Sequence, residues 1–287
     1  MGSACSDGRQ YPHADVRVHA IQTGRLVGNE TVMRGEGWSS LFHRRRPYEF
    51  PALSFLLEHP EGPIMIDTGL STRASVPRGQ RLMGAPAPVI RPEEEIEPRM
   101  RAKGLAPDDV RRVVITHLDW DHTGGLGTFP NAEVLVHRPE YEFASKLLGR
   151  LRYQPKLWPA SFDPTVYDLD PEPVGPFPAS KSVTASGDVR LVPIAGHSIA
   201  QVGVVVETDG PRLLFAADHV LRQDWFVEDS AAGNLVGLGA LFFPKQAIET
   251  SRRVHAFVEE SPTVLLPSHD SETPARLEAR HPLRSPG

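Results

Sequence analysis

The chain of 287 residues has very little cysteine: Cys5 is its single thiol. Disulfide bonds therefore cannot hold the fold together, and thiolates cannot build a metal site. No apolar run approaches the roughly 18 residues that a membrane-spanning helix requires. The first residues, MGSACSDGRQYPHADV, also lack the apolar stretch of a signal peptide. We therefore expect a cytoplasmic protein that does not associate with membranes.

A basic stripe is missing as well. The formal net charge is -5, and the longest runs of like charge are Arg44–Arg46 and Glu93–Glu95. This argues against a protein that binds nucleic acid. Hydrophobic residues (40%) and charged residues (23%) are present in proportions ordinary for a globular protein. Residues 1–14 are polar and small, and we predict that they are disordered. No later segment resembles a linker, so we predict a single domain at 15–287.

Two stretches of the chain have the pattern of a β-hairpin, with short apolar runs on either side of a turn. Their predicted strands are Phe55–Leu57 with Ile64–Ile66, and Val202–Val206 with Leu213–Ala216. Each hairpin is followed by an aspartate, Asp67 or Asp218, which suggests an internal duplication. Hairpins exclude a purely parallel sheet, because strands joined by a tight turn run antiparallel.

Helical and extended patterns are mixed along the rest of the chain, which indicates an α/β or α+β class. Helices are expected to begin at Asp108, Arg138 and Ala247, and further strands are expected at Val113–Ile115 and Thr263–Leu266. The segments Arg73–Arg101 and Pro155–Pro178 lack periodicity, and we predict long loops there. The first of these segments could be a lid or an arm of a homodimer, and the sequence leaves both options open.

Five apolar runs end in a residue that can bind a metal. These residues are Asp67, His117, His197, Asp218 and His269. Ligand sites in open α/β sheets form at the carboxyl ends of strands, so these side chains are expected at one rim. Nitrogen and oxygen ligands suit zinc, iron or manganese and disfavour copper(I) or an iron–sulfur cluster.

The stretch THLDWDHTGG contains the densest group of potential ligands. Within six positions it holds His117, Asp119, Asp121 and His122. Side chains two positions apart can reach one metal, while the adjacent Asp-His pair points to a second. Two metals need a carboxylate between them to offset their repulsion, and Asp218 is the candidate. Gly124 and Gly125 are expected to let the chain turn sharply after the ligands.

A structural role is the simpler interpretation for any single one of these residues. A lone buried histidine is usually a hydrogen-bonded core residue, and an aspartate after a strand is usually a turn or cap residue. His137 also ends an apolar run, and we expect it to be structural. His219, next to Asp218, is expected to be structural or to support a ligand. The metal site is favoured because so many ligand types occur at strand ends.

These motifs resemble those of the metallo-β-lactamase superfamily. THLDWDHTGG, with IMIDTG before it and GHSIAQVG, FAADH and LLPSHD after it, matches the family's motif order over about residues 50–270. The resemblance implies a four-layer αββα sandwich with two divalent metal ions at the edge of the sheets. It implies a first metal bound by His117, Asp119 and His197, a second bound by Asp121, His122 and His269, and Asp218 between them. Asp67 would orient a ligating histidine.

Asp119 departs from the family's usual pattern, His-x-His-x-Asp-His. A carboxylate is harder than an imidazole and adds a negative charge. We expect zinc at the two sites, with iron or manganese as alternatives because of Asp119. Another interpretation is that the Asp119 side chain is too short to reach, so that the first metal binds weakly. The sequence leaves these open.

The resemblance implies a hydrolase in which a hydroxide between two metals attacks a carbonyl. Asp121 would move a proton during this reaction. The layout is most similar to the N-acyl-homoserine lactonase branch, so we predict a lactone or related ester as small-molecule substrate. That branch often carries a tyrosine three residues after the bridging aspartate, where this chain has Leu221. Aromatic residues that could line an acyl pocket, or else belong to the core, are Trp120, Trp225, Phe226, Phe242 and Phe243.

Three other functions stay open. A thioester hydrolase of the glyoxalase type would use the same metal centre. A di-iron redox enzyme also has a carboxylate at the position of Asp119, although such enzymes typically carry a flavin domain for which this chain has no room. A metal-poor binding protein would result if Asp119 had weakened the site. β-Lactam hydrolysis fits less well, and a nuclease would need basic patches that are missing.

Overall fold

The computed structural model describes residues 16–30, 47–76, 81, 85–155, 158–228 and 243–283. Among these residues the strands form two sheets. The first has the order β4-β1-β2-β3-β5-β6-β7, and the second has the order β12-β11-β10-β9-β8. The disorder predicted for residues 1–14 concerns a segment outside the described residues.

The elements have the following bounds. The strands of the first sheet are β1 (Arg17–Asn29), β2 (Pro47–Glu58), β3 (Ile64–Ile66), β4 (Ala87–Val89), β5 (Arg112–Ile115), β6 (Glu133–His137) and β7 (Thr165–Tyr167). Those of the second are β8 (Lys181–Ser182), β9 (Val189–Pro193), β10 (Val202–Val206), β11 (Arg212–Ala217) and β12 (Thr263–Pro267). The helices are α3 (Ile96–Ala102), α4 (Arg138–Ser145), α5 (Leu147–Arg152), α6 (Gln223–Glu228), α8 (Pro244–Glu260) and α9 (Thr273–Ala279), with 3-10 turns η2 (Pro92–Glu94), η3 (Pro107–Asp109) and η4 (Leu126–Thr128).

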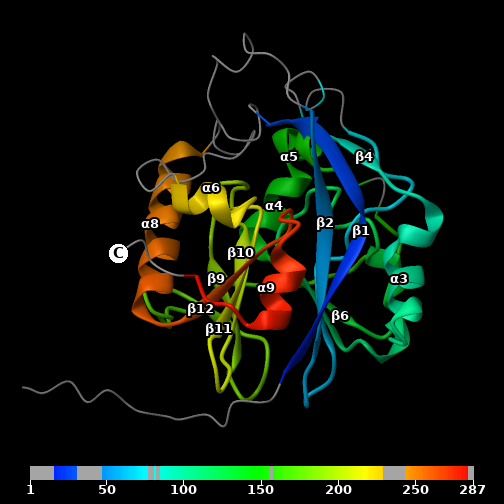
Figure 1. Cartoon of the computed structure of the whole chain (residues 1–287). Helices are drawn as coiled ribbons and strands as arrows, with labels where there is room; N and C mark the ends of the chain where they lie inside the picture. The colour runs from blue at the N-terminus through cyan, green and yellow to red at the C-terminus, as the bar shows by residue number, and fades with distance from the viewer. Residues whose placement is uncertain are drawn as a thin grey trace, which may run out of the picture.

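Three apolar clusters show that the sheets and helices form four layers. Between the sheets, Phe55 of β2 packs against Phe215 of β11. On the outer face of the first sheet, Val113 packs in one cluster with Met100 of α3. On the outer face of the second sheet, residues of β10 and β11 pack against Phe257 of α8. Helices thus cover both outer faces, which confirms the predicted αββα sandwich (Figure 1).

The two sheets repeat one pattern of strand pairing. In the first, β1, β2 and β3 are antiparallel neighbours, and β3 then pairs in parallel with β5. In the second, β9, β10 and β11 are antiparallel neighbours, and β11 pairs in parallel with β12. This is the arrangement that an internal duplication predicts. In both halves an aspartate, Asp67 or Asp218, follows the strand that changes from antiparallel to parallel pairing.

The predicted hairpins and the amphipathic helix expected from Ala247 are confirmed. β2 pairs with β3, β10 pairs with β11, and α8 includes the amphipathic segment that begins at Ala247. The helix expected from Asp108 is only a 3-10 turn. The helix from Arg138 is divided at Lys146 into α4 and α5, because Lys146 has an extended backbone with ψ of 161°.

Both segments predicted to be long loops contain regular structure. Arg73–Arg101 includes β4, which pairs with β1, and most of α3. Pro155–Pro178 includes β7, which pairs in parallel with β6. These strands have only three residues each, too few to show a hydrophobic period. The prediction of a long loop was therefore wrong for the described parts of both segments.

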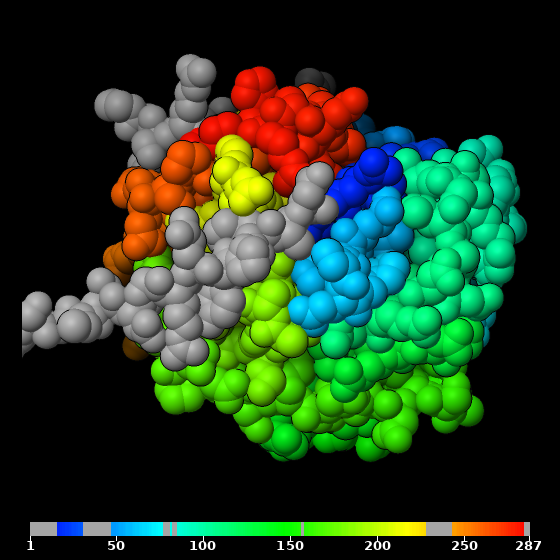
Figure 2. All heavy atoms as spheres, turned by 90° about the horizontal axis from the view of Figure 1, so that it is seen from below, coloured from blue at the N-terminus to red at the C-terminus, as the bar shows by residue number. Residues whose placement is uncertain are grey.

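The C-terminal helix α9 joins the two halves of the molecule. It contacts both β12 and β1. Arg280, at its end, donates a hydrogen bond over 3.0 Å to the carbonyl oxygen of Val16. Seen from below, the red C-terminal residues lie beside the blue start of β1 (Figure 2). Within the described part of the chain, no helix combines the length and apolar character needed to cross a membrane.

Candidate metal centre

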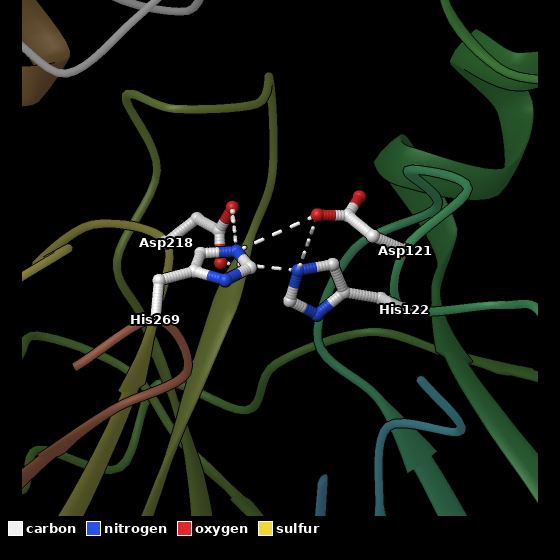
Figure 3. A group of neighbouring side chains, drawn as sticks. All are labelled: Asp121, His122, Asp218 and His269. Carbon is white, nitrogen blue, oxygen red and sulfur yellow. Dashed lines mark hydrogen bonds and ion pairs between the residues drawn. The ribbon is translucent and has the colours of Figure 1, made fainter. Parts of the chain in front are cut away.

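The predicted ligands all lie just beyond the carboxyl ends of strands. His117, Asp119, Asp121 and His122 belong to the loop that follows β5, His197 follows β9, Asp218 follows β11 and His269 follows β12. The first sheet therefore supplies four of these side chains and the second supplies three. Figure 3 shows side chains from the two halves pointing toward one another. The structure thus brings together every residue that the sequence analysis proposed as a ligand.

The first group consists of His117, Asp119 and His197, whose potential ligand atoms all lie within 4.8 Å of one another. The Nε2 atom of His197 is 3.0 Å from Oδ2 of Asp119, and Nε2 of His117 is 3.3 Å from the same oxygen. Asp119 is therefore long enough to meet both imidazoles. Its carboxylate lies close enough to share a metal with them, and its role as a ligand stays a prediction.

The second group consists of Asp121, His122, Asp218 and His269, again within 4.8 Å. Nε2 of His269 lies 3.5 Å from Oδ2 of Asp121 and 3.1 Å from Oδ2 of Asp218. Nε2 of His122 lies 3.8 Å from Oδ2 of Asp121. The adjacent Asp-His pair thus belongs to the second group, as its spacing predicted.

Asp218 stands between the two groups. Its Oδ1 atom is 3.0 Å from Nε2 of His122, in the second group. Its Oδ2 atom is 3.6 Å from Nε2 of His197 and 4.0 Å from Nε2 of His117, in the first group. One carboxylate therefore faces histidines of both groups. This is the position that a bridging ligand requires.

Hydrogen bonds on the far side of three histidines turn their Nε2 atoms toward the centre. Asp67 accepts from Nδ1 of His122 over 2.7 Å, and the carbonyl oxygen of Pro51 accepts from Nδ1 of His269 over 2.8 Å. Nδ1 of His117 is 3.1 Å from the hydroxyl of Thr116. With Nδ1 protonated, each ring keeps a lone pair on Nε2, which is the state that binds a metal.

Asp67 is the predicted residue that supports a ligand. It accepts hydrogen bonds from the amide and the hydroxyl of Thr116, both over 2.8 Å, in addition to that of His122. Its backbone has a φ of 57°, in the left-handed region, which aspartate tolerates better than most residues. This conformation lets the chain leave β3 while the carboxylate turns back toward the loop after β5.

The centre has the chemical character of a binuclear metal site. The Nε2 atoms of His117 and His122 are buried and make no hydrogen bond among the described residues. Burial lowers the pKa of His269, but the charge of Asp218 and the contacts with Asp121 outweigh it and raise that pKa to about 10. The carboxylates therefore make the centre favourable for positive charge. Unbonded imidazole nitrogens beside carboxylate oxygens fit two divalent cations.

Arg152, at the end of α5, was not identified from the sequence. Its Nε atom donates to Oδ1 of Asp119 over 3.0 Å, and a terminal nitrogen donates to Oδ2 over 2.6 Å. Its other terminal nitrogen donates to the carbonyl oxygen of His197 over 2.8 Å. Such a two-point pair between guanidinium and carboxylate has a fixed geometry. Arg152 therefore braces two ligands of the first group.

The pair with Arg152 changes the interpretation of Asp119. Burial would raise the pKa of Asp119, but the charge of Arg152 and the contacts with His117 and His197 hold that pKa well below its ordinary value. Asp119 is thus ionised, and its negative charge is matched by the positive charge of Arg152. Asp119 therefore adds a negative charge, as expected, and Arg152 places a positive charge beside it, which the sequence did not indicate. The greater hardness of a carboxylate remains as an argument for iron or manganese.

Glu140 of α4 joins the two ligand loops and was also missed. Its side chain is buried and accepts hydrogen bonds from the amide of Leu118 over 3.3 Å and the hydroxyl of Ser198 over 2.9 Å. It also accepts from the amide of Ala200 and from the hydroxyl of Tyr153. A glutamate in a helical pattern gives no sequence signal for such a role, since most are exposed.

The glycines after the ligand loop are required by close packing. A Cβ atom on Gly124 would lie 2.5 Å from the backbone of Leu70 and Ser71, and one on Gly125 would lie 2.5 Å from the side chain of Ile96. Neither glycine has a positive φ. Both glycines lie in the turn that leads into η4, as predicted, and their lack of a side chain also lets the loop approach the segment after Asp67.

An apolar cluster borders the centre. It contains Leu26, Phe50, Ala52, Leu70, Trp120, Leu221 and Trp225. The ring of Phe50 packs edge-on against that of His269, with centroids 5.3 Å apart. Phe226 instead belongs to the core beneath α8, and Phe243 precedes that helix. Phe242 lies outside the described residues.

The two histidines that were not expected to bind a metal have structural partners. Nδ1 of His137 donates to the carbonyl oxygen of Ala200 over 2.9 Å. Nε2 of His219 is 3.1 Å from the hydroxyl of Ser251 on α8. Burial lowers the pKa of His219 to about 3, so this ring is neutral. Neither histidine belongs to the two ligand groups.

Comparison with known proteins places these features in a family. The model of the metallo-β-lactamase superfamily matches residues 47–269. The N-acyl homoserine lactonase AttM of Azorhizobium caulinodans is 38% identical over 136 residues, which cover 45% of this chain and 49% of that protein. The match thus spans about half the length of that relative. The N-acyl homoserine lactonase AiiA of Bacillus thuringiensis subsp. kurstaki is 28% identical over 77% of this chain and 82% of its own length.

Solved structures share the fold. A Bacillus thuringiensis AiiA variant with N-decanoyl-L-homoserine bound has a TM-score of 0.71 and 24% identity, and the match covers 93% of this chain and 96% of that one. The dizinc quorum-quenching lactonase AidC has a TM-score of 0.61 and 13% identity, with 90% and 89% of the two chains covered. At these identities the likeness concerns the fold.

Proposed function

Because the chain belongs to the metallo-β-lactamase superfamily, we propose that it is a metal-dependent hydrolase that opens the ring of a lactone, with N-acyl homoserine lactones as the candidate substrates. The observation that carries this proposal is the position of Asp218 between two ligand groups. The relatives named as N-acyl homoserine lactonases support the substrate class.

The donor set would hold two divalent cations. His117, Asp119 and His197 would bind one, Asp121, His122 and His269 would bind the other, and Asp218 would contact both. When bound, two such cations supply an activated water and polarise the carbonyl oxygen of the substrate. Zinc is the metal proposed, and AidC, which shares the fold, is named as a dizinc lactonase.

Asp121 is the proposed proton-transfer residue. Its Oδ2 atom faces the imidazoles of His269 and His122, while its other oxygen points away from them (Figure 3). That second oxygen can accept the proton of the attacking water and return it to the alcohol that leaves when the ring opens. Ring opening breaks the ester C–O bond and yields a carboxylate and a hydroxyl group in the same product.

The apolar cluster gives this substrate class a physical basis. Trp120 directly follows a first-group ligand, and Phe50 packs against His269, so apolar surface adjoins the ligands on two sides. An acyl chain is a suitable partner for such surface. Leu221 belongs to the same cluster and extends its apolar character where related lactonases often carry a tyrosine. Contact with the acyl chain would then contribute more to binding than a hydrogen bond to the carbonyl.

The proposal is tested by ring opening of N-acyl homoserine lactones of several chain lengths, followed as acid release by zinc-loaded protein. We expect turnover that increases with chain length. Asp218→Asn should reduce turnover at least about a hundredfold and lower the metal content, because the charge between the groups is lost. Normal turnover by this variant would contradict the binuclear mechanism. Thioester hydrolysis without lactone opening would instead support the glyoxalase-type alternative.

A further inference from the structure

Arg152 distinguishes the first ligand group from the second. It makes two hydrogen bonds to the carboxylate of Asp119 and one to the backbone of His197, so it contacts two of the three ligands of the first group. In the second group, the outer partner of His122 is the carboxylate of Asp67, and that of His269 is a backbone carbonyl. The first group is thus supported by the cationic side chain of Arg152. The second is supported by the anionic side chain of Asp67 and by a neutral carbonyl oxygen.

We propose that Arg152 sets the affinity of the first group for metal and makes it the weaker, exchangeable site of the two. The inference rests on the binuclear centre of the proposed function but not on its substrate. Asp119 and Arg152 act together as a neutral unit in the position where the family usually has an imidazole. The difference from an imidazole is that the guanidinium of Arg152 keeps a positive charge close to the metal, although the pair as a whole is neutral.

The contacts of Asp119 leave one lone pair for a metal, but they weaken the carboxylate oxygen as a ligand. A carboxylate has about four lone-pair positions, and the arginine fork takes one on each oxygen. Oδ2 also faces Nε2 of His197 at 3.0 Å and Nε2 of His117 at 3.3 Å, so one of its lone pairs points into the ligand group. Asp119 can therefore bind a metal through one oxygen. The guanidinium withdraws electron density from that oxygen and lowers its strength as a ligand.

The positive charge of Arg152 also opposes a divalent cation directly. The side chains of Arg152 and Asp119 are only 14% and 10% exposed, so water and salt screen the charge weakly. Arg152 is held in place because the next residue, Tyr153, is buried and donates a hydrogen bond from its hydroxyl to Glu140. The charge next to the second group has the opposite sign, since Asp67 adds negative charge behind His122. Both effects favour tighter binding in the second group.

The test measures zinc affinity and stoichiometry in chelator-treated full-length protein, by competition with a chromophoric chelator. The native chain should bind two equivalents whose affinities differ at least tenfold. Arg152→Met should tighten the weaker equivalent roughly tenfold or more and leave the tighter one unchanged, because it removes the nearby charge. Arg152→Lys should keep the weaker site weak. His197→Ala should remove the weaker equivalent alone.

The control and the contrary outcomes are defined by the same assay. Arg150→Met removes an exposed arginine of the same helix and should change neither affinity. Equal affinities in the native chain, or a weaker first site in Arg152→Met, would overturn the inference but leave the binuclear centre intact. Failure of the native chain to bind zinc would overturn the proposed function as well.

A second variant keeps the test informative if Arg152→Met does not fold. Asp119→His with Arg152→Met replaces the charged pair by a neutral imidazole and leaves no buried charge without a partner. This double variant should bind two zinc equivalents of similar, high affinity. Asp119→His alone is the wrong variant, because it would leave the guanidinium of Arg152 buried without its carboxylate, which is costly. A double variant that still binds one equivalent weakly would contradict the role of Arg152.

Discussion

The chemical role of Asp119 depends on Arg152, which lies 33 positions further along the chain. The ligands themselves could be predicted, because each follows an apolar run and several share one short motif. Arg152 could not, because the break between α4 and α5 decides where the last turn of α5 points. No spacing in the sequence connects an arginine in that turn with the ligand loop. A local motif therefore identified the ligands but not their charge balance.

At the same scale, the structure predicts that Asp67 matters chiefly for the second group. Asp67→Asn replaces one carboxylate oxygen by an NH2 group, which accepts no hydrogen bond. The side chain can then no longer accept from Nδ1 of His122 and from both the amide and the hydroxyl of Thr116. We expect the zinc affinity of the second group to fall roughly ten- to a hundredfold. Competition with a chelator measures this change. The surface variant Asp168→Asn, which removes an exposed partner of Arg138, should leave both affinities intact.

Elements with a clear apolar run or a helical period were predicted, and elements without either were missed. The hairpins have continuous apolar runs and α8 has a helical period, and the structure contains them. The 13 residues of β1 have neither, because a bulge between Gln22 and Arg25 interrupts the alternation. Within the bulge, Gly24 has a φ of 76° and a Cβ there would lie 2.8 Å from the carbonyl oxygen of Val89. Long-range pairing with β2 and β4, rather than local pattern, stabilises this strand.

Helix α4 should stabilise the ligand loops through Glu140. Glu140→Ala would leave the buried amides of Leu118 and Ala200 and the hydroxyl of Tyr153 without their acceptor. Each buried group that loses its partner costs about 1–3 kcal/mol, so we expect a loss of roughly 3 kcal/mol or more in unfolding free energy. Urea denaturation measures it. Glu142→Ala, on the exposed side of the same helix, is the control and should change stability by less than about 0.5 kcal/mol.

The same variant also tests whether the loops are coupled. Because Glu140 contacts Leu118 and Ser198, its removal should loosen the first ligand group, which contains His117 and His197. Zinc binding to this group should weaken, while the second group should be less affected. Equal stability of the Glu140→Ala and Glu142→Ala variants would mean that α4 does not brace the ligand loops.

On the scale of the whole molecule, the metal centre lies where the two halves meet. One half contributes the loop after β5, and the other contributes the ends of β9, β11 and β12. Each half by itself provides members of both ligand groups, but neither half completes a group. The repeated strand pattern explains this arrangement, because it places equivalent strand ends of both sheets at one rim. The motifs predicted the fold class. How the two halves pack against each other became clear only from the tertiary structure.

Metal removal should therefore lower the stability of the whole molecule. A ligand that binds the folded state at about a thousand times its dissociation constant stabilises that state by about 4 kcal/mol per site. At roughly 2 °C for each kcal/mol, chelation should lower the midpoint of thermal unfolding by about 8 °C or more. The carboxylates of Asp121 and Asp218 would then lose the cations that offset their mutual repulsion. Differential scanning calorimetry with and without a chelator measures the shift.

Adding zinc back should restore the midpoint of thermal unfolding in the native chain but only in part in Asp218→Asn. An unchanged midpoint after verified metal removal would show that the centre does not hold the two halves together.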